Sequence, residues 1–204
     1  MKPKYPKIKL VHPCLSLVTT EHISVLEYMV TLGRGASITK WVEQVFKTAK
    51  EMHWEGMEPE ERARFLGDSL ELLTEYLMKV NVMGNKQGLL NYKPVPLRDD
   101  YGVDALGMKN DVQIVVQCKY RHNPQAYITY SALARTFTHG VLKYGLNPSL
   151  KKNIWLVTTG AGANTNCQKI LGQRLHVLNR DHLKRQLDGN IDFWCGFLMS
   201  AKSK

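Results

Sequence analysis

Residues 101–120 read YGVDALGMKNDVQIVVQCKY, two apolar runs separated by Asn110-Asp111. Both turn residues tolerate the left-handed backbone that a two-residue hairpin loop requires. The second run contains VQIVV at residues 112–116, which is apolar on both faces, as is typical of a central strand covered on both sides. We therefore predict a β-hairpin made of strands over residues 102–108 and 112–120.

The turn also predicts the register of this hairpin. With Asn110 and Asp111 in the loop, residue 109 faces residue 112, and Asp104 lies directly opposite Gln117. Directly opposed residues share one face of a sheet, and Lys119, two residues further on, points to that same face. Three polar side chains are thus predicted to converge on one face of otherwise apolar strands.

This polar cluster has two interpretations, because buried polar groups are unfavourable unless they are paired or bind a metal. Asp104 and Lys119 could form an ion pair across the hairpin, and from spacing alone this is the simpler interpretation. Alternatively, Asp104, the Gln117 side-chain oxygen and the Cys118 backbone carbonyl could hold Mg²⁺. Lys119 would then hold or polarise an attacking water and offset the charge of a phosphate.

Helical patterns dominate the chain before the hairpin. We predict a helix over residues 21–32, a second helix that Ser37 can cap, and a third over residues 60–80 that begins near Pro59. The second helix carries one apolar stripe, made of Ile38, Trp41, Val42, Val45, Phe46 and Ala49. Residues 89–97 are predicted to form a first strand, and Pro94 and Pro96 favour an edge or irregular strand.

Helices and strands alternate after the hairpin. The predicted elements are a helix over 127–144, a strand over 153–159, a helix over 163–173, a strand over 175–178 and a helix over 181–187. The complete order predicts an α/β fold with a mixed central sheet. We place a basic and helical N-terminal extension over residues 1–58 and the core over residues 59–204.

The charge of the chain is basic and uneven. Lys and Arg outnumber Asp and Glu by 28 to 18, a net charge of +10. A basic excess favours polyanionic partners such as nucleic acid, although solubility alone explains it equally well. Residues 51–104 are net acidic, whereas the first ten residues and the segment from Lys143 onward are basic, and a basic rim around an acidic patch would suit a metal site that acts on phosphate.

The cysteines and the hydropathy indicate where the protein resides. None of the 4 cysteines forms a CxxC pair, so neither a zinc site nor a redox motif is predicted, and a reducing interior is the natural location. Prolines interrupt any apolar run near the start, and no apolar stretch is long enough to span a bilayer. We expect an intracellular protein of the cytoplasm, nucleoid or nucleus, without a membrane partner.

A resemblance to a known family enters with GVD at residues 102–104 and VVQCKYR at residues 115–121. This pattern resembles the Mrr-like restriction endonucleases, a branch of the PD-(D/E)XK superfamily in which Gln often takes the third acidic position. The helix segment GDSLE at residues 67–71 also looks similar, so Glu71 matches the helix-borne acidic residue of that branch. The resemblance continues through WLVTTG at 155–160 and covers roughly residues 64–187.

The resemblance implies a restriction-endonuclease-like αβββαβ core and an endonuclease that hydrolyses nucleic acid, DNA rather than RNA, with Mg²⁺ or Mn²⁺. The implied catalytic residues are Asp104, Gln117, Lys119 and Glu71, and the implied metal ligands are Asp104, Gln117, Glu71 and the backbone carbonyl of Cys118. Glu75, one turn further on, is a rival to Glu71, and Asp99 and Asp100 could also approach the metal.

Contacts with nucleic acid are predicted at Tyr120, Arg121, Arg135, Lys151 and Lys152. Cutting both strands with one site per chain would require two copies, so a homodimer is one expected assembly. Mrr-like nucleases are often fused to specificity or motor domains, which implies such a partner, fused or separate.

Two other functions stay open at this point. Gln is neutral, so the centre has one carboxylate fewer than a D…ExK site, and a catalytically inactive nucleic-acid-binding module with the same fold is the main alternative. The segment GAGAN at residues 160–164 invites a nucleotide-binding interpretation. It lacks the third glycine of GxGxxG and lies too near the C-terminus for a dinucleotide fold, so a tight strand-to-helix turn is favoured.

Overall fold

The computed structural model describes residues 7–11, 20–54, 58–82, 88–96 and 102–203. Its helices are α1 (Thr20–Thr31), α2 (Ile38–Trp54), α3 (Pro59–Val82), α4 (Tyr130–Leu142), α5 (Thr165–Leu171), α6 (Arg180–Leu187) and α7 (Ile191–Ala201). Its strands are β1 (Leu90–Pro94), β2 (Ala105–Lys109), β3 (Val112–Lys119), β4 (Tyr127–Ile128), β5 (Ile154–Thr158), β6 (Gly162–Ala163) and β7 (Leu175–Leu178).

A mixed five-stranded sheet forms the centre of the molecule, with the strand order β1-β2-β3-β5-β7. β1, β2 and β3 pair antiparallel, whereas β5 and β7 run parallel to β3. The predicted α/β class is therefore confirmed, with β3 as a central strand. β1 lies at an edge, where its terminal Pro94 needs no donor on the outer side.

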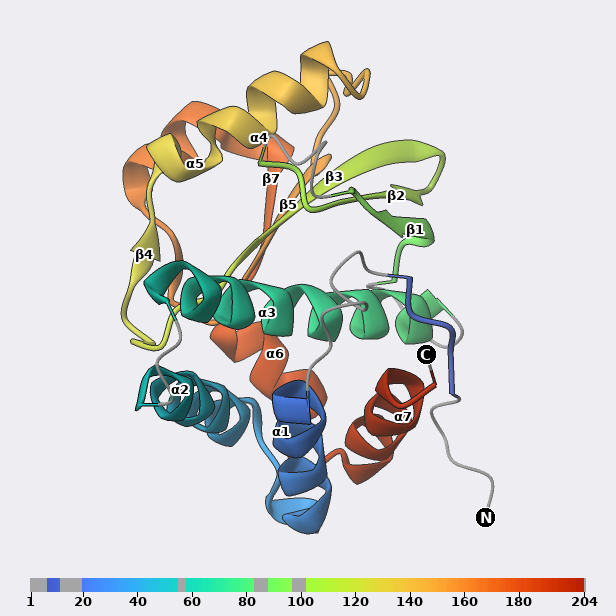
Figure 1. The fold of residues 1–204 in the computed structure, drawn as a ribbon. Coiled ribbons are helices and arrows are strands. Elements are labelled where there is room, and N and C mark those ends of the chain that lie inside the picture. The colour runs from blue at the N-terminus through green and yellow to red at the C-terminus, as the bar shows by residue number, and fades with distance from the viewer. Residues whose placement is uncertain (1–6, 12–19, 55–57, 83–87, 97–101, 204) are drawn as a thin grey trace.

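Helices cover both faces of this sheet in distinct layers (Figure 1). α4 and α5 lie on one face, and α3 crosses the other face. α1, α2 and α7 form a further layer beyond α3, with α6 between that layer and the sheet. Among the described residues, no helix is both long and apolar enough to pass through a membrane.

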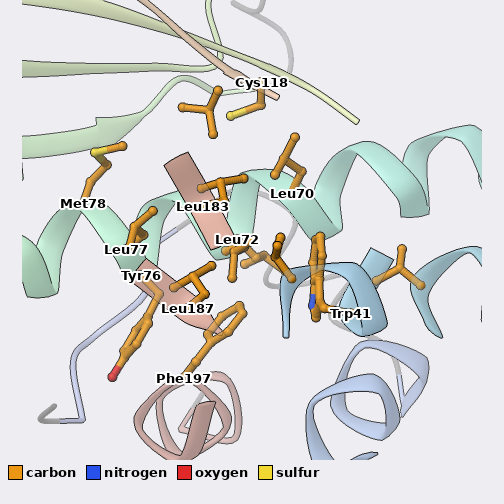
Figure 2. Packing of buried hydrophobic residues seen from close by; sticks show 14 of the residues in the cluster. Trp41, Leu70, Leu72, Tyr76, Leu77, Met78, Cys118, Leu183, Leu187 and Phe197 are labelled. Atoms are coloured by element: carbon orange, nitrogen blue, oxygen red, sulfur yellow. The ribbon is translucent and has the colours of Figure 1, made fainter. Parts of the chain in front are cut away.

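The helix α3 joins these layers into one core because it is apolar on two sides. Figure 2 shows Cys118 of the sheet on one side of α3, and Trp41 of α2 and Phe197 of α7 on the other. All three side chains are buried in a single hydrophobic cluster. The N-terminal helices thus share a core with the rest of the chain, while the division into two domains at residue 58 stays a prediction.

The beginning of α2 shows how the sequence specifies a helix end. The Ser37 hydroxyl oxygen accepts a hydrogen bond from the Lys40 backbone N–H at 3.2 Å, as the predicted cap requires. The Asp188 carboxylate accepts a second one from the Ile38 N–H at 2.8 Å. Two otherwise unpaired donors of the first turn are thereby satisfied, one of them by a residue far along the chain.

Three elements differ from the predictions. Residues 127–128 form strand β4 instead of the start of a helix, and they pair in parallel with residues 162–163 of β6, where a turn was predicted. The helix α7, with its sequence IDFWCGFLMSA, was not predicted. Its buried residues lie on one face, but Ile191 and Met199 make the exposed face apolar as well, which hides the stripe. The Asn190 side chain caps the helix by accepting from the Phe193 N–H.

His176 predicts how stability depends on pH. Its ring packs against Trp155 with 4.6 Å between ring centroids. Partial burial, followed by the nearby charges of Lys152, His182 and Lys109, lowers the pKa of His176 from 6.5 to about 4. Between these values the unfolded chain binds a proton that the folded chain does not, so the free energy of unfolding falls as the pH falls through this range.

Urea unfolding followed across this pH range tests the effect. The His176→Gln variant is expected to lose less stability between about pH 6.5 and about pH 4 than the unaltered protein, because Gln does not titrate. Equal losses in the two proteins would contradict the role of His176.

Candidate active site

The predicted hairpin register is confirmed. Lys109 pairs with Val112 and Ala105 pairs with Val116, which places Asp104, one residue before β2, opposite Gln117. The turn residues Asn110 and Asp111 have φ values of 48° and 60°, the left-handed conformation that a type I′ loop requires at both positions. The first strand begins at residue 105 instead of 102, but the Asp104 N–H still donates to the Val116 carbonyl at 2.9 Å.

An open pocket of about 810 Å³ lies beside this end of the hairpin. It is lined by Glu71 of α3, by Asp104, and by Gln117 and Lys119 of β3, so the four predicted catalytic residues meet at one place. The beginning of α4 forms another wall of the same pocket, with Arg135 exposed along it. Two acidic and several basic groups thus border one cavity.

The Asp104 carboxylate is fixed at the bottom of this pocket. The side chain is only 5% exposed. Its Oδ2 accepts hydrogen bonds from the Cys118 backbone N–H at 2.5 Å and from the Gln117 Nε2 at 2.6 Å. Two donors to one oxygen hold the anionic form in place, since hydrogen bonds to a carboxylate stabilise its charge.

The Gln117 amide faces Asp104 with its nitrogen. Besides donating to Asp104, Nε2 lies 3.2 Å from the backbone carbonyl oxygen of Cys118 and donates to it. The amide oxygen Oε1 points away and accepts from the Thr136 hydroxyl at 2.9 Å. Two of the predicted ligand oxygens, Asp104 Oδ2 and the Cys118 carbonyl oxygen, therefore accept from the Gln117 amide nitrogen in this arrangement.

The two rival glutamates of α3 have different surroundings. Glu75 is fully buried, forms an ion pair with Lys79 and accepts a hydrogen bond from the Val11 N–H at 2.7 Å. Glu71, one turn earlier, is half-buried and lines the pocket together with Asp104. This placement favours Glu71 over Glu75 as the acidic residue of the site.

Two buried groups respond to the negative charge at this site. Burial raises the pKa of the Cys118 thiol well above its usual value, and the charges of Asp104 and Glu71 raise it further. The nearby Lys119 charge acts in the opposite direction. Burial likewise raises the pKa of Tyr92, with Glu75, Glu71 and Asp104 adding to the effect. Both groups therefore remain neutral and pack as uncharged side chains beneath the pocket.

The end of β5 fixes the segment that follows Lys119. The Thr158 hydroxyl donates to the Lys119 carbonyl at 2.6 Å. The Thr159 hydroxyl oxygen accepts from the Arg121 N–H at 2.6 Å and donates to the Arg121 carbonyl at 2.8 Å. Arg180 Nε donates to the Thr159 carbonyl at 2.6 Å. The hydrogen bonds of Thr158 and Thr159 thus hold the backbone at and just after the Lys119 position.

The predicted nucleic-acid contacts fall in different places. Arg121 and Arg135 line the pocket. Tyr120 also borders it, but its hydroxyl donates to the Val42 carbonyl at 2.7 Å, so this side chain fastens β3 to α2. Lys151 and Lys152 are exposed just before β5 begins, at the opposite end of that strand from the pocket. Asp99 and Asp100 lie outside the described residues.

Three backbone donors of the turn over residues 160–164 are engaged within the protein. The Gly160 N–H donates to the Thr158 hydroxyl at 3.1 Å, and the N–H groups of Ala161 and Asn164 donate to the carbonyls of Ala126 and Ile128 at 2.9 Å each. A Cβ at position 160 would lie 2.4 Å from the Ala126 carbonyl oxygen, which accounts for the glycine. This turn is a packing feature, and these amides are not directed at a phosphate.

Two residues support the site in ways that the sequence did not predict, although Gly102 belongs to the GVD segment noted above. Gly102 has φ +86°, and a Cβ there would lie 3.1 Å from the Cβ of Arg135, so only glycine lets α4 approach this segment. Thr136 is fully buried behind Gln117 and donates to the Gly102 carbonyl at 2.5 Å. A threonine within an amphipathic helix has no pattern that would predict this contact.

The donor set of the pocket suits a hard divalent cation. Its charged oxygens come from Asp104 and Glu71, and neutral oxygens are available from Cys118 and, after rotation of its amide, from Gln117. Mg²⁺ is commonly bound through one or two carboxylates and retains several waters, which this set allows. Within the described part of the chain, no cluster of three or more His, Cys, Asp or Glu side chains could hold a metal, so a site made only of such ligands is not present there.

Comparison of the chain with protein-family models, with curated proteins and with solved structures gave no match.

Proposed function

We propose that this protein is a metal-dependent endonuclease that hydrolyses nucleic-acid phosphodiester bonds, with an Mrr-like D…QxK centre. The observation that carries the proposal is the convergence of Asp104, Gln117, Lys119 and Glu71 on one pocket from three separate segments of the chain. An isolated ion pair across the hairpin would not require a helix-borne carboxylate at the same pocket. DNA is the proposed substrate, and Mg²⁺ or Mn²⁺ the proposed cofactor.

The order of elements supports the same proposal. The run α3-β1-β2-β3-α4-β5 follows the αβββαβ core of a restriction-endonuclease-like fold once the two-residue strand β4 is set aside. The antiparallel β1-β2-β3 meander with β5 parallel to β3 agrees with the mixed sheet of such a core. The order of strands alone does not define a function, so the assignment depends on the pocket.

The residues of the pocket have distinct proposed roles. Asp104 and Glu71 would hold the cation together with the neutral oxygens beside them, and the cation, when bound, supplies a Lewis acid for the phosphate. Lys119 would hold and polarise the attacking water and offset the negative charge that develops on the phosphate. Arg121 and Arg135, at the pocket wall, would bind flanking phosphates.

A second candidate is a nucleic-acid-binding module without catalytic activity. The observation that favours it is the Gln117 amide, whose nitrogen satisfies Asp104 and Cys118 without any cation. Such a module would bind DNA with a strong dependence on salt, because phosphate contacts release counterions. It would not cut DNA with any divalent cation.

Incubation of the full chain with supercoiled plasmid separates the two candidates. We expect nicking or linearisation with Mg²⁺ or Mn²⁺ and no reaction with EDTA. Retained DNA binding without cutting under any metal would instead support the binding module. If the protein neither binds nor cuts DNA or RNA, this result would contradict both candidate functions.

The two glutamates of α3 give a matched pair of variants. Glu71→Gln is expected to weaken Mn²⁺ binding and cleavage while the protein remains folded, because Glu71 lines the pocket. Glu75→Gln is expected to lower the free energy of unfolding by about 1–3 kcal/mol, because it weakens a buried interaction with Lys79. Mn²⁺ titration and urea unfolding of both variants provide the measurements. The reverse pattern would assign the site to Glu75.

A further inference from the structure

The Gln117 side chain is held from behind by a single hydroxyl. Thr136 Oγ1 lies 2.9 Å from Gln117 Oε1 and 2.5 Å from the Gly102 carbonyl oxygen. Thr136 is 0% exposed and Gln117 2% exposed, so the hydroxyl and the amide are shielded from water, whereas Gly102 is half-buried. A hydroxyl has one proton and two lone pairs, and therefore Thr136 cannot donate fully to both oxygens. The contact with Gly102 is the shorter of the two, so Gln117 Oε1 competes with it for the one hydroxyl proton.

Exchange of the amide oxygen and nitrogen of Gln117 would remove this competition for one proton. Thr136 would then accept a hydrogen bond from Nε2 and donate its one proton to the Gly102 carbonyl. The same rotation would bring Oε1 to the two oxygens that now accept from Nε2, namely Asp104 Oδ2 and the carbonyl oxygen of Cys118. Oxygens that face one another in a buried site repel unless a cation lies among them.

We infer that Thr136 is a positioning residue whose hydroxyl supports two orientations of the Gln117 amide and favours the one that presents oxygen to a divalent cation. Without the cation, the amide nitrogen satisfies Asp104 and Cys118. With the cation bound, the amide is rotated and its nitrogen faces Thr136. The Thr136 hydroxyl then accepts from this nitrogen, which keeps a hydrogen-bond partner in its buried position. Thr136 is absent from the pocket lining, so it acts through Gln117 and does not touch the substrate.

This inference rests on the proposed function and gives a neutral side chain a specific use there. An amide can donate to the site when the cation is absent and accept when it is present, whereas a carboxylate can only accept. A glutamate at position 117 would leave Asp104 and Cys118 without the donor that Gln117 now provides. The Gln117 amide thus provides a donor to Asp104 and Cys118 when the site is empty and an oxygen ligand when the cation is bound.

Mn²⁺ affinity of the full chain, measured without nucleic acid from the electron paramagnetic resonance of unbound Mn²⁺, tests this role. Thr136→Val keeps the shape of the side chain but removes the hydroxyl, and it is expected to weaken Mn²⁺ binding roughly three- to tenfold. Thr136→Ser restores the hydroxyl and is expected to bind Mn²⁺ nearly as the unaltered protein does. In a Gln117→Glu background the effect of Thr136→Val should shrink, because a carboxylate presents oxygen in either orientation.

If Thr136 only holds α4 against Gly102, the Thr136→Val variant would behave differently. Thr136→Val would then lower the free energy of unfolding and leave Mn²⁺ affinity unchanged, and this result would overturn the inference. Failure of the unaltered protein to bind Mn²⁺ through Asp104, judged against Asp104→Asn, would overturn the inference and the proposed function together.

A second measurement needs no substitution at Thr136. The Gln117 side-chain ¹⁵NH₂ signals, identified by their loss in Gln117→Glu, are expected to shift markedly when Mg²⁺ is added, because their acceptor changes from a carboxylate to a hydroxyl. Signals that stay in place while Mg²⁺ binds would overturn the inference even if Thr136→Val does not fold.

Discussion

Lys119→Ala is expected to reduce metal-dependent cleavage by on the order of 10³-fold while the protein remains folded. Lys119 is half-buried at the last position of β3 and borders the pocket beside Asp104 and Gln117. In the proposed mechanism its ammonium group would hold a water and offset charge on a phosphate. The strand end should persist in the variant, because the Thr158 hydroxyl binds the backbone carbonyl of residue 119 at 2.6 Å. Initial rates of plasmid nicking give the measurement.

Two further variants make the comparison specific. Lys184→Ala removes the same charge from an exposed position on α6 and should retain cleavage. Asp104→Asn should lose cleavage as well, since it keeps an oxygen that can accept from the Cys118 N–H but removes the carboxylate charge. Undiminished cutting by both Lys119→Ala and Asp104→Asn would disprove the assignment of the site.

The second large effect concerns stability and the last helix. Trp194→Ala is expected to lower the free energy of unfolding by about 3–5 kcal/mol. Trp194 is 0% exposed, packs edge-on against Phe193 with 5.4 Å between ring centroids, and donates from its indole nitrogen to the Leu187 carbonyl at 3.1 Å. The substitution removes a large apolar volume and one of the two donors to that carbonyl, which also accepts from the Asn190 N–H at 3.2 Å.

Met199→Ala provides the control on the same helix. Met199 is 43% exposed, so its truncation should change the free energy of unfolding by no more than about 0.5 kcal/mol. Urea unfolding of both variants provides the measurement. A small loss for Trp194→Ala would mean that α7 is not an integral part of the hydrophobic core.

The hairpin at the centre of the sheet could be predicted because local chemistry determines it. Asn110 and Asp111 accept the left-handed backbone of a two-residue loop, and the loop length alone sets the partners of every later residue. The placement of Asp104 opposite Gln117 follows from that register without any tertiary information. Glu71, in contrast, was placed by resemblance, since no local rule joins a helix position to a strand pair.

Other parts of the fold depend on contacts that the sequence does not display. The two-residue strands β4 and β6 exist because residues 127–128 and 162–163 meet in space, and neither segment has an extended pattern of its own. The helix α7 buries one face against α1 and α3, but Ile191 and Met199 make its exposed face apolar too, so no helical stripe reveals it. A periodic pattern arises only where the face that meets water is polar.

The orientation of the Gln117 amide is the least predictable feature of the site. It depends on Asp104, Cys118 and Thr136, and the last of these lies on a helix that is separated from Gln117 by a short strand and a turn. The sequence indicated an oxygen of Gln117 as a ligand, whereas the structure directs the nitrogen toward Asp104. Only the complete set of hydrogen-bond partners decides between these orientations.

The loop at Asn110-Asp111 also makes the site intolerant of changes in chain length. If the loop stays two residues long, one inserted residue there shifts the pairing by one position, so that Val116 or Cys118 instead of Gln117 faces Asp104. The β3 run is apolar on both faces, and the sheet would accept this shift far more readily than the pocket would. Insertions or deletions in an exposed turn, far from the pocket, would thus erase the constellation while leaving a protein that still folds.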